Sequence, residues 1–176
     1  MEKKENQRVR LTKLMLKEAL VDLLEQTPLQ QITITEICER AEINRTTFYK
    51  YYSNECDLYA DIENDFITIL EVNLAKGPEK SLEKLLNLIC NNRKMATALI
   101  NNSSVENLSQ RIFSLPSIIN YSSLKQLDKM PYNEEIVSFL FNGSYALIKT
   151  WINTGFSIPP KELSILMINL INKLIN

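Results

Sequence analysis

The sequence predicts an all-helical protein, and three observations support that prediction. Apolar residues recur every three or four positions along most of the chain, which is the spacing of one face of an α-helix. The chain has only three glycines and six prolines, so few residues interrupt this periodicity. Strand-like alternation is confined to the stretch ITIT at 32–35, where a threonine that caps the next helix explains the pattern better.

The first third of the chain predicts three helices separated by short breaks. The first helix ends near Thr27-Pro28. Its apolar stripe consists of Leu16, Ala19, Leu20, Leu23 and Leu24. Thr33, followed three residues later by Glu36, is a capping-box pattern that begins a short second helix. Asn44 is a suitable N-cap for a third helix through RTTFYKYY.

The rest of the chain continues at helical spacing. A fourth helix is expected over about 55–75, where a Gly-Pro pair follows it. A fifth is expected as one continuous amphipathic helix from residue 82 to about Ile100. Residues 101–132, interrupted by NNSS and two prolines, predict one or two shorter helices. Two final helices are expected, over 134–154 and after Pro159-Pro160.

The final two helices carry apolar residues almost all round, so each must be covered on two sides. The chain's own core can cover one side, and a second copy of the chain is the natural cover for the other. The sequence therefore predicts a homodimer built on this helix pair, and the alternative is a wholly intramolecular core. The residues expected in the dimer interface are Phe141, Tyr145, Ile148, Leu163, Leu166, Met167, Leu170 and Leu174.

The residue inventory excludes several kinds of active site. The chain has no histidine, which removes most metal sites, catalytic triads and imidazole acid–base mechanisms. Three widely spaced cysteines are expected to be buried thiols rather than metal ligands or disulfides, namely Cys38, Cys56 and Cys90. Paired carboxylates such as Glu134-Glu135 are more simply explained as helix N-terminal charges. No enzyme activity, cofactor or metal is expected.

Composition also bears on location and on charge. The chain begins without the apolar core of a signal peptide, and its longest apolar stretch is shorter than the ~20 residues of a membrane span. A cytoplasmic protein without membrane association is therefore expected. The net charge of −1 gives no overall basic signature, so nucleic-acid binding would have to rest on local clusters. Residues 1–17 form one such cluster, with six bases and two acids.

Residues 44–52, NRTTFYKYY, combine bases, hydroxyls and aromatic rings in a way that neither a buried nor a fully solvated helix requires. Phe48 and Tyr52 are four positions apart and can both face a core. The residues left on the outer faces are Arg45, Thr46, Tyr49 and Lys50. A second helix with such a surface after a tight turn is typical of a helix-turn-helix that lies in the DNA major groove. The alternative is a solvated helix that happens to be basic.

The run ITITEICERAEINRTTFYKYYSNECDLY resembles the helix-turn-helix of the TetR family of bacterial transcriptional regulators. The later stretch FLFNGSYALIKTWINTGFSIPPKEL resembles the C-terminal regulatory segment of one branch of that family. The resemblance implies an all-helical homodimer with a three-helix N-terminal DNA-binding head and a C-terminal helical domain for dimerisation and regulation. It implies that the base-reading residues are Arg45, Thr46 and Lys50. The phosphate contacts that it implies are Thr33, Tyr49 and Tyr51.

The resemblance also divides the chain. A helix-turn-helix domain is expected at 1–54, a connecting helix at about 55–75, and a regulatory and dimerisation domain at 76–176. Two residues depart from the family pattern. Glu42 stands at a turn position where glycine is usual, so a positive φ there would be costly. Glu55 stands where lysine is common, which removes one phosphate contact.

Two functions are compatible with this reading of the sequence. The leading hypothesis is a sequence-specific transcriptional repressor that binds a palindromic operator and is released when an effector binds the C-terminal domain. The alternative is a DNA-binding co-activator or adaptor whose C-terminal domain docks a protein partner, because that domain lacks convergent polar groups for a small ligand. The expected partners are double-stranded DNA, a second copy of the chain, and an unidentified small-molecule effector or protein. The sequence nominates no effector-binding residues.

Overall fold

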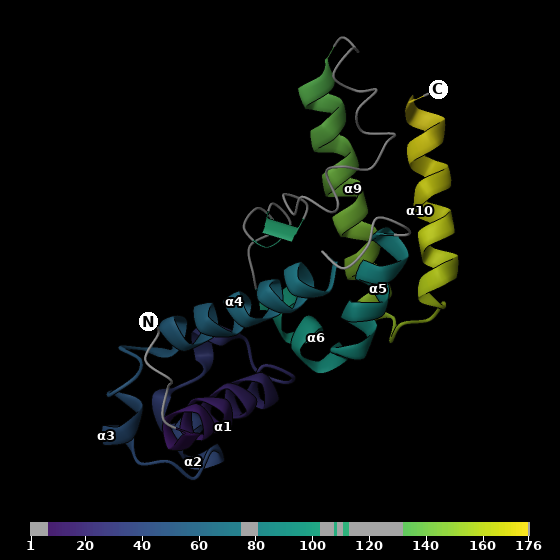
Figure 1. Ribbon diagram of the computed structural model, residues 1–176. Helices are drawn as coiled ribbons and strands as arrows, with labels where there is room; N and C mark the ends of the chain where they lie inside the picture. Colours follow the sequence, from purple (N-terminus) through teal and green to yellow (C-terminus); the bar gives the residue numbers. More distant parts are fainter. Residues whose placement is uncertain (1–6, 75–80, 103–107, 109–110, 113–131, 176) are drawn as a thin grey trace, which may run out of the picture. The chain divides into compact units, whose positions relative to one another are not determined.

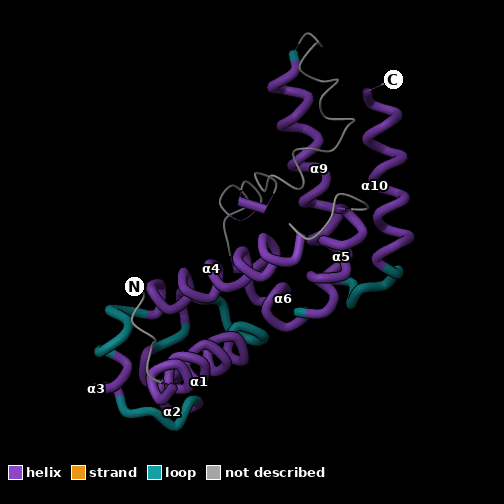
Figure 2. The backbone as a smooth tube through the Cα atoms, in the orientation of Figure 1, coloured by secondary structure: helices purple, strands orange, loops and turns teal. Residues whose placement is uncertain are grey.

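The computed structural model describes residues 7–74, 81–102, 108, 111–112 and 132–175 (Figure 1). Every regular element in these ranges is helical, and the tube in Figure 2 shows only helices and loops there. The elements are α1 (Gln7–Leu23), the 3-10 turn η1 (Leu29–Gln31), α2 (Ile34–Arg40), α3 (Arg45–Phe48), α4 (Glu55–Leu74), α5 (Ser81–Asn91), α6 (Arg93–Asn102), α9 (Asn133–Asn153) and α10 (Pro160–Ile175). The all-helical prediction is confirmed, whereas most of the region predicted to hold one or two shorter helices, 101–132, lies outside the described residues.

The chain divides into two compact units, which we name the head (residues 1–65) and the body (residues 66–176). The division falls inside α4, so the first part of this helix belongs to the head and the remainder to the body. Each unit is described by itself.

The head has an apolar core to which α1, α2, the segment after α2 and the start of α4 all contribute. α1 packs against α2, and α2 packs against α3. The large side chains with no exposed surface are Leu16, Leu20, Ile37, Phe48, Leu58 and Ile62. Burying a side chain of this size stabilises a fold by roughly 1.5–3 kcal/mol. Leu16 and Leu20 come from the stripe predicted on the first helix, whereas Leu23 of that stripe is only half-buried.

The predicted helix starts of the head are present. The Thr33 hydroxyl oxygen accepts the Glu36 backbone N–H (3.3 Å), and the Glu36 carboxylate accepts the Thr33 backbone N–H (2.8 Å), which completes the capping box of α2. The Asn44 side-chain oxygen accepts the Thr46 backbone N–H (2.8 Å) and caps α3. These side chains satisfy backbone donors that a helix start leaves without partners.

Glu42 follows α2 and adopts the left-handed backbone conformation. The sequence predicted that this conformation would be costly for a glutamate. Its φ is +55°, and its N–H donates to the Glu39 carbonyl (3.2 Å) while the Ile43 N–H donates to the Cys38 carbonyl (2.9 Å). This pair of bonds is the Schellman arrangement, in which glycine usually occupies the left-handed position. A glutamate there costs roughly 1–2 kcal/mol of backbone strain relative to a relaxed conformation.

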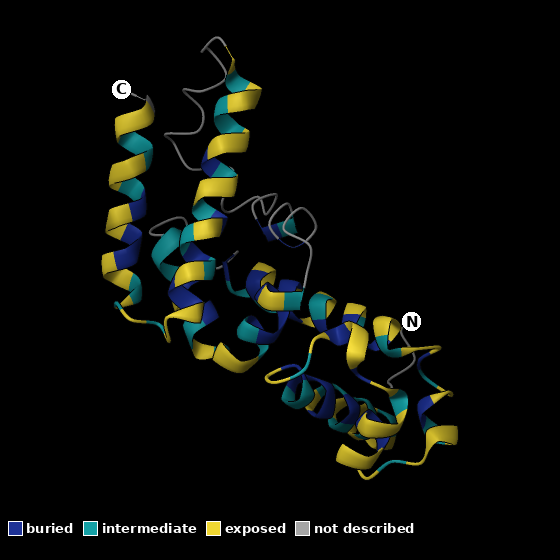
Figure 3. Ribbon diagram, turned by 180° about the vertical axis from the view of Figure 1, so that it is seen from behind, coloured by how far each residue is buried: buried dark blue, intermediate teal, exposed yellow. Residues whose placement is uncertain are grey.

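In the body, α10 packs against α5, α5 against α6, and α6 against α9. The fully buried leucines of this core are Leu70, Leu74, Leu85, Leu86 and Leu99. Figure 3 shows that burial is concentrated where these helices meet, and that α9 and α10 are lined with exposed residues along their other sides. The apolar residues of α9 and α10 therefore do not all belong to the core.

The single helix predicted from residue 82 to about Ile100 is wrong, because the chain turns at Asn92 between α5 and α6. The Asn92 side chain donates to the Leu88 carbonyl (2.8 Å), and the Arg93 Nε donates to the Cys90 carbonyl (3.2 Å). Side-chain hydrogen bonds to carbonyls at the end of α5 therefore accompany the turn, while the Asn92 backbone N–H also donates to the Leu88 carbonyl (3.1 Å). The apolar spacing runs through this turn without change, so periodicity alone gave no sign of it.

The turn after α9 is anchored by aromatic contacts. Phe156 has a φ of +61°, which is unfavourable for a bulky residue, and follows Gly155 at +72°. Its ring meets Trp151 edge-on, with centroids 4.8 Å apart, and the Arg93 guanidinium lies 4.6 Å from its centroid. The Trp151 indole N–H donates to the Ile158 carbonyl (2.8 Å). These contacts offset the strain and fix the chain reversal between α9 and α10.

Two further expectations concern single residues and spans. Cys38 is buried as expected, but Cys56 is exposed and Cys90 is half-buried, so the prediction of three buried thiols is wrong for two of them. Cys56 lies in the first turn of α4, on a side that the described residues of the head leave exposed. Among the described residues, none of the helices has the length and apolar character required to cross a membrane.

Candidate DNA-binding surface

The helix predicted through RTTFYKYY is shorter than expected. Only Arg45–Phe48 is α-helical, and the chain then continues through turns to Tyr52. In those turns the Lys50 N–H donates to the Thr47 carbonyl (3.3 Å) and the Tyr51 N–H to the Phe48 carbonyl (2.9 Å), both in the tighter i to i+3 pattern. We name residues 44–52 the recognition segment.

The inner side of the recognition segment is aromatic. Phe48 is fully buried and Tyr52 is 6% exposed, which confirms that both face the core. The centroid of the Phe48 ring lies 5.8 Å from that of Tyr52 and 5.6 Å from that of Tyr49. The contact with Tyr49 is edge-on. Aromatic packing therefore connects the inner side of the segment to its outer side.

The outer side carries the residues expected to read DNA. The exposed side chains there are Arg45, Thr46, Tyr49 and Lys50, and Tyr51 is half-buried. An arginine fork, hydroxyl groups and a lysine amine on one short exposed segment are donors suited to base edges and phosphates. The fold thus brings all three predicted base readers together with two predicted phosphate contacts.

Thr33 is the predicted phosphate contact that the fold uses differently. Its hydroxyl donates to the Glu36 carboxylate (2.7 Å), and its backbone N–H donates to the same oxygen (2.8 Å). A hydroxyl has one proton to donate, so Thr33 cannot donate to a phosphate while the capping box is closed. Hydrogen bonds from the Thr33 side chain and backbone hold the pKa of Glu36 below its ordinary value, which keeps a negative charge beside the hydroxyl.

The start of α4 is also closed by its own residues. The Asn54 side-chain oxygen accepts the Asp57 backbone N–H (2.8 Å), and the Asp57 carboxylate accepts the Ser53 backbone N–H (3.0 Å). Glu55 lies in the same first turn, half-buried. Two carboxylates at the positive end of the helix stabilise it, and they occupy the place where a phosphate would otherwise be attracted. The Asn54 cap was not predicted, although an asparagine three positions before Asp57 is a recognisable signal of a helix start.

Sequence reasoning missed a charged network behind the recognition segment. The Lys17 amine lies 2.9 Å from an Asp61 carboxylate oxygen and 2.6 Å from an Asp65 oxygen, and the Tyr52 hydroxyl donates to that same Asp61 oxygen (2.7 Å). Burial alone would raise the pKa of Asp61, but the hydrogen bonds from Lys17 and Tyr52 bring it below its ordinary value. Burial alone would lower the pKa of Lys17, but the two aspartates raise it. The charged forms of Lys17 and Asp61 are therefore both stabilised in the fold.

A second ion pair ties α2 to α1. The Arg40 guanidinium donates through Nε (3.1 Å) and Nη2 (2.7 Å) to one Asp22 carboxylate oxygen. Arg40 is exposed but forms an ion pair within the head, and Arg45 and Lys50 are exposed on the recognition segment.

The predicted dimer interface divides into two groups. Four of its residues are buried in the single chain, at 2–4% exposure: Tyr145, Ile148, Leu163 and Met167. The physical reason is that the inner faces of α9 and α10 pack on α6 and α5. Met167 also lines the groove between α9 and α10. Leu166, Leu170 and Leu174 are exposed by 43–50%, and Phe141 is half-buried.

An apolar groove of about 420 Å³ lies between α9 and α10. Leu170 and Leu174 line it from α10, and Phe139, which is 64% exposed, lines it from α9. Sequence reasoning omitted Phe139, although it falls two residues before Phe141 on the same predicted helix. The exposed apolar residues around this groove form the α9–α10 surface: Phe139, Leu166, Leu170 and Leu174.

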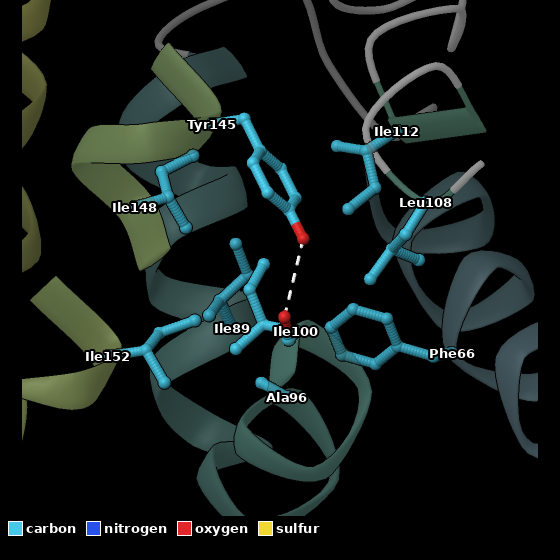
Figure 4. Close-up of a pocket in the computed structure, with 9 residues that line it drawn as sticks. All are labelled: Phe66, Ile89, Ala96, Ile100, Leu108, Ile112, Tyr145, Ile148 and Ile152. Carbon is cyan, nitrogen blue, oxygen red and sulfur yellow. Dashed lines mark hydrogen bonds between the residues drawn. The ribbon is translucent and has the colours of Figure 1, made fainter. Parts of the chain in front are cut away.

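One small space inside the body is lined by described residues. The space around Phe66, Tyr145 and Ile100, shown in Figure 4, measures about 10 Å³, which is enough for about one water molecule. Its lining is apolar except for the Tyr145 hydroxyl, which points inward and donates to the Ile100 carbonyl (3.4 Å). The described lining is therefore packed core.

Comparison with known proteins decides the family. Residues 76–173 match the TetR-family model described as a transcriptional regulator C-terminal region, which is more than half of the chain. The chain belongs to the TetR family of transcriptional regulators. It is accordingly a DNA-binding transcriptional regulator from a family that is not enzymatic. The resemblance to the TetR family drawn from the sequence is confirmed.

Two curated relatives resemble this TetR-family regulator in sequence. The HTH-type dhaKLM operon transcriptional activator DhaS of Lactococcus lactis is 34% identical over 64 residues, covering 36% of this chain and 34% of DhaS. The uncharacterized HTH-type transcriptional regulator YxbF of Bacillus subtilis is 22% identical over 162 residues, covering 84% of this chain and 41% of YxbF. The matched part of this regulator thus spans about two fifths or less of the length of these relatives.

Solved structures show the same fold. A TetR transcriptional regulator from Streptococcus agalactiae matches with a TM-score of 0.72 at 18% identity, covering 93% of this chain and 95% of that one. The dihydroxyacetone kinase operon activator DhaS matches with a TM-score of 0.61 at 22% identity, covering 93% and 96%. The fatty acid degradation regulator FadR from Bacillus halodurans matches with a TM-score of 0.59 at 14% identity, covering 92% and 97%. At these identities the likeness concerns the fold alone.

Proposed function

We propose that this regulator binds a palindromic DNA operator as a homodimer and reads bases through Arg45, Thr46 and Lys50. The observation that supports the proposal is the exposure of these three side chains on a segment whose inner side is locked by Phe48 and Tyr52. A rigid inner side with exposed donors is what base recognition requires, because base edges are read at hydrogen-bond distance.

In this proposal the phosphate contacts come from the tyrosines of the recognition segment. Tyr49 is exposed and Tyr51 half-exposed, so their hydroxyls can donate to the DNA backbone. Thr33 joins them only if its capping box with Glu36 opens on DNA. The domain roles in this proposal are those expected from the sequence: DNA binding at 1–54, a connecting helix over about 55–75, and dimerisation and regulation at 76–176.

The homodimer in this proposal is held by the α9–α10 surface. Leu166, Leu170 and Leu174 are a one-sided apolar row on α10, exposed in the single chain, and the groove beside them has room for side chains of another helix. Exposed apolar surface of this kind marks protein contacts. Phe141 and Phe139 extend the row onto α9. The buried residues Tyr145, Ile148, Leu163 and Met167 support this surface from within.

The direction of regulation has two candidates. A repressor released by an effector is the first, as the sequence analysis proposed. A co-activator or adaptor whose body docks a protein is favoured by two observations, the packed 10 Å³ space in the described body and the activator DhaS among the relatives. A reporter gene placed behind the selected operator distinguishes them, because a repressor lowers and an activator raises its transcription when the protein is expressed.

The experiment that tests DNA reading starts from selection. The wild-type protein is used to enrich duplexes from a random-sequence library, and binding of the enriched duplex is compared with binding of a scrambled duplex. Arg45→Ala is expected to lose about 1–3 kcal/mol on the enriched duplex and to blur the preference at one base pair per half-site.

The matched control is Arg10→Ala, which removes an exposed arginine of α1 outside the recognition segment and is expected to leave base preference unchanged. Equal losses for Arg45→Ala on enriched and scrambled duplexes would reassign Arg45 to a phosphate contact. The effect of Lys50→Ala on the enriched and scrambled duplexes is interpreted in the same way.

A further inference from the structure

The recognition segment is tied to α1 and α4 through one carboxylate oxygen. The Oδ2 atom of Asp61 accepts a hydrogen bond from the Tyr52 hydroxyl (2.7 Å) and lies 2.9 Å from the Lys17 amine. The same amine reaches Asp65 at 2.6 Å. Tyr52 is the last residue of the recognition segment, Lys17 lies on α1, and both aspartates lie on the part of α4 that belongs to the head.

The network is shielded where it meets the recognition segment. Tyr52 is 6% exposed, and the Lys17 side chain is 13% exposed. The exposed fraction rises to 33% for the Asp61 side chain and 50% for Asp65. Water therefore competes least at the Tyr52 end, and the hydrogen bond to Asp61 is charge-assisted, which makes it one of the stronger and more directional bonds in the head.

The recognition segment needs such an anchor because its own helix is short. α3 has four residues, and so short a helix is not stable by itself. Its orientation must come from contacts on the inner side. The packing of Phe48 supplies most of the burial, but apolar contact has no preferred direction. The hydrogen bond from the Tyr52 hydroxyl fixes the orientation of the Tyr52 side chain. The ring contact between Tyr52 and Phe48 transmits that orientation to the rest of the segment.

We infer that Tyr52, Asp61 and Lys17 are positioning residues for base reading, which hold the recognition segment in register with the DNA bases. The inference rests on the proposed function, in which Arg45, Thr46 and Lys50 read bases. Base reading tolerates displacements of only about 0.5 Å, whereas charge attraction to the phosphate backbone tolerates more. Loss of the network therefore lowers discrimination between DNA sequences more than it lowers non-specific binding.

A second ion pair in the same head provides the comparison. Arg40 and Asp22 link α2 to α1 at 2.7 Å, and neither residue belongs to the recognition segment or to the network of Tyr52, Asp61 and Lys17. Asp22→Asn thus removes an ion pair of similar length without touching the proposed positioning network. Asp65→Asn is an internal comparison, because it removes a partner of Lys17 and leaves the bond between Tyr52 and Asp61 in place.

The test measures the ratio of affinities for two duplexes, one enriched by the wild-type protein from a random library and one a scrambled duplex of the same composition. Tyr52→Phe removes a single oxygen and is expected to reduce this ratio roughly 3- to 10-fold, with little change on the scrambled duplex. Asp61→Asn is expected to have a similar effect, and Asp65→Asn a smaller one. The double variant of Tyr52→Phe and Asp61→Asn is expected to be no worse than the stronger single variant, because both act through one bond.

Melting curves are recorded for every variant, and binding is measured well below the lowest melting temperature so that all the proteins are folded. The inference is overturned if Tyr52→Phe and Asp61→Asn leave the ratio unchanged, or if Asp22→Asn lowers it equally. Either result would make the network a source of stability only. A wild-type protein that enriches no sequence would overturn the proposed function and this inference with it, and that result is recognised before any variant is made.

Discussion

The head and the body expose opposite kinds of surface. The head presents Arg45, Thr46 and Lys50 beside the polar caps of α2 and α4, whereas the body presents a row of leucines and a phenylalanine that are each more than 40% exposed. Donors and positive charge suit a polyanion such as DNA, and an apolar row suits another protein surface. The two surfaces are therefore suited to different classes of partner in the proposed function. Leu11 and Leu14, exposed on α1, are an exception that nothing in the head explains.

The two units also differ in how they satisfy polar groups. In the head, side chains close the starts of α2, α3 and α4, and ion pairs join α1 to α2 and α4. In the described body the main stabilising feature is apolar packing, with polar contacts gathered at the turn after α5 and the turn after α9. A change of charge is therefore expected to act through specific partners in the head and through lost association in the body.

The largest effect is expected from placing charge on the body's apolar row. The double variant Leu166→Glu with Leu170→Glu should convert a dimer into monomers, because each carboxylate buried in an apolar interface costs several kcal/mol. Both residues are exposed in the single chain, so the fold should survive. Sedimentation velocity measures the oligomeric state, and circular dichroism measures helix content. Asn169→Glu, at an exposed polar position of α10, is the control. A double variant that still sediments as a folded dimer would show that the interface lies elsewhere.

The next effect concerns charge inside the head. Lys17→Met should cost the head about 1–3 kcal/mol, since two carboxylates lose a mostly buried partner while remaining partly solvated. The single tryptophan, Trp151, lies in the body, so hydrogen exchange of α1 and the recognition segment is the measurement specific to the head. Lys161→Met, at an exposed lysine of the body, should leave that exchange unchanged. Equal exchange in both variants would contradict the prediction.

The same network predicts the pH dependence of the head. The pKa of Asp61 is lowered in the fold, so its contribution is complete above the unfolded value of about 4 and is lost as pH falls through the lower folded value. The pKa of Lys17 is raised, so its contribution is complete below about 10.4 and is lost as pH rises through the higher folded value.

A smaller effect is expected at Thr33, where it tests how the head uses its hydroxyls. Thr33→Ala removes the N-cap of α2 and should destabilise the head by about 0.5–2 kcal/mol. Because the hydroxyl already donates to Glu36, affinity for DNA should change by no more than about twofold, with an unchanged salt slope. Fluorescence anisotropy at several salt concentrations measures both quantities. A salt slope reduced by about one would restore Thr33 as a phosphate contact.

The smallest effect on stability is expected at Glu55. Glu55→Lys replaces an acid at the positive end of α4 and should cost about 0.3–1 kcal/mol. It should also tighten binding to specific and non-specific DNA alike and steepen the slope of log K against log salt by up to ~1. Glu71→Lys makes the same charge change at an exposed position of α4 in the body and serves as the control. Unchanged affinity and slope in Glu55→Lys would mean that this residue faces away from DNA.

Local features of the head were predictable from sequence because their partners lie within a few residues. The Thr33 and Glu36 box, the Asn44 cap and the inward direction of Phe48 and Tyr52 each follow from spacings of two to four positions. Such spacings fix which side chains can meet on one helix turn, whatever the rest of the chain does. The prediction for Thr33 failed to allow for competition, because one hydroxyl was assigned both a cap and a phosphate.

Features of the body were harder to predict because the same apolar sequence pattern fits more than one packing arrangement. α9 and α10 are apolar almost all round, so the sequence alone did not separate the faces that pack inside, at Tyr145 and Met167, from those that stay exposed, at Leu166 and Leu170. The turn at Asn92 was hidden for a similar reason, since apolar spacing continues through it. Periodicity reports that a residue is apolar but not which neighbour covers it.

The helical class, the helix-turn-helix and the exposed side chains of the recognition segment thus followed from the sequence, because all of them depend on short-range spacing. Tertiary structure alone decided which apolar faces are covered and which carboxylates meet Lys17, since Asp65 lies 48 positions along the chain from it. The physical reason is that a helix fixes contacts three or four residues apart, whereas contacts between helices depend on how the whole chain packs. The network behind the recognition segment consists of contacts that depend on this packing. Only the folded head brings Tyr52 and Lys17 to the same carboxylate oxygen of Asp61.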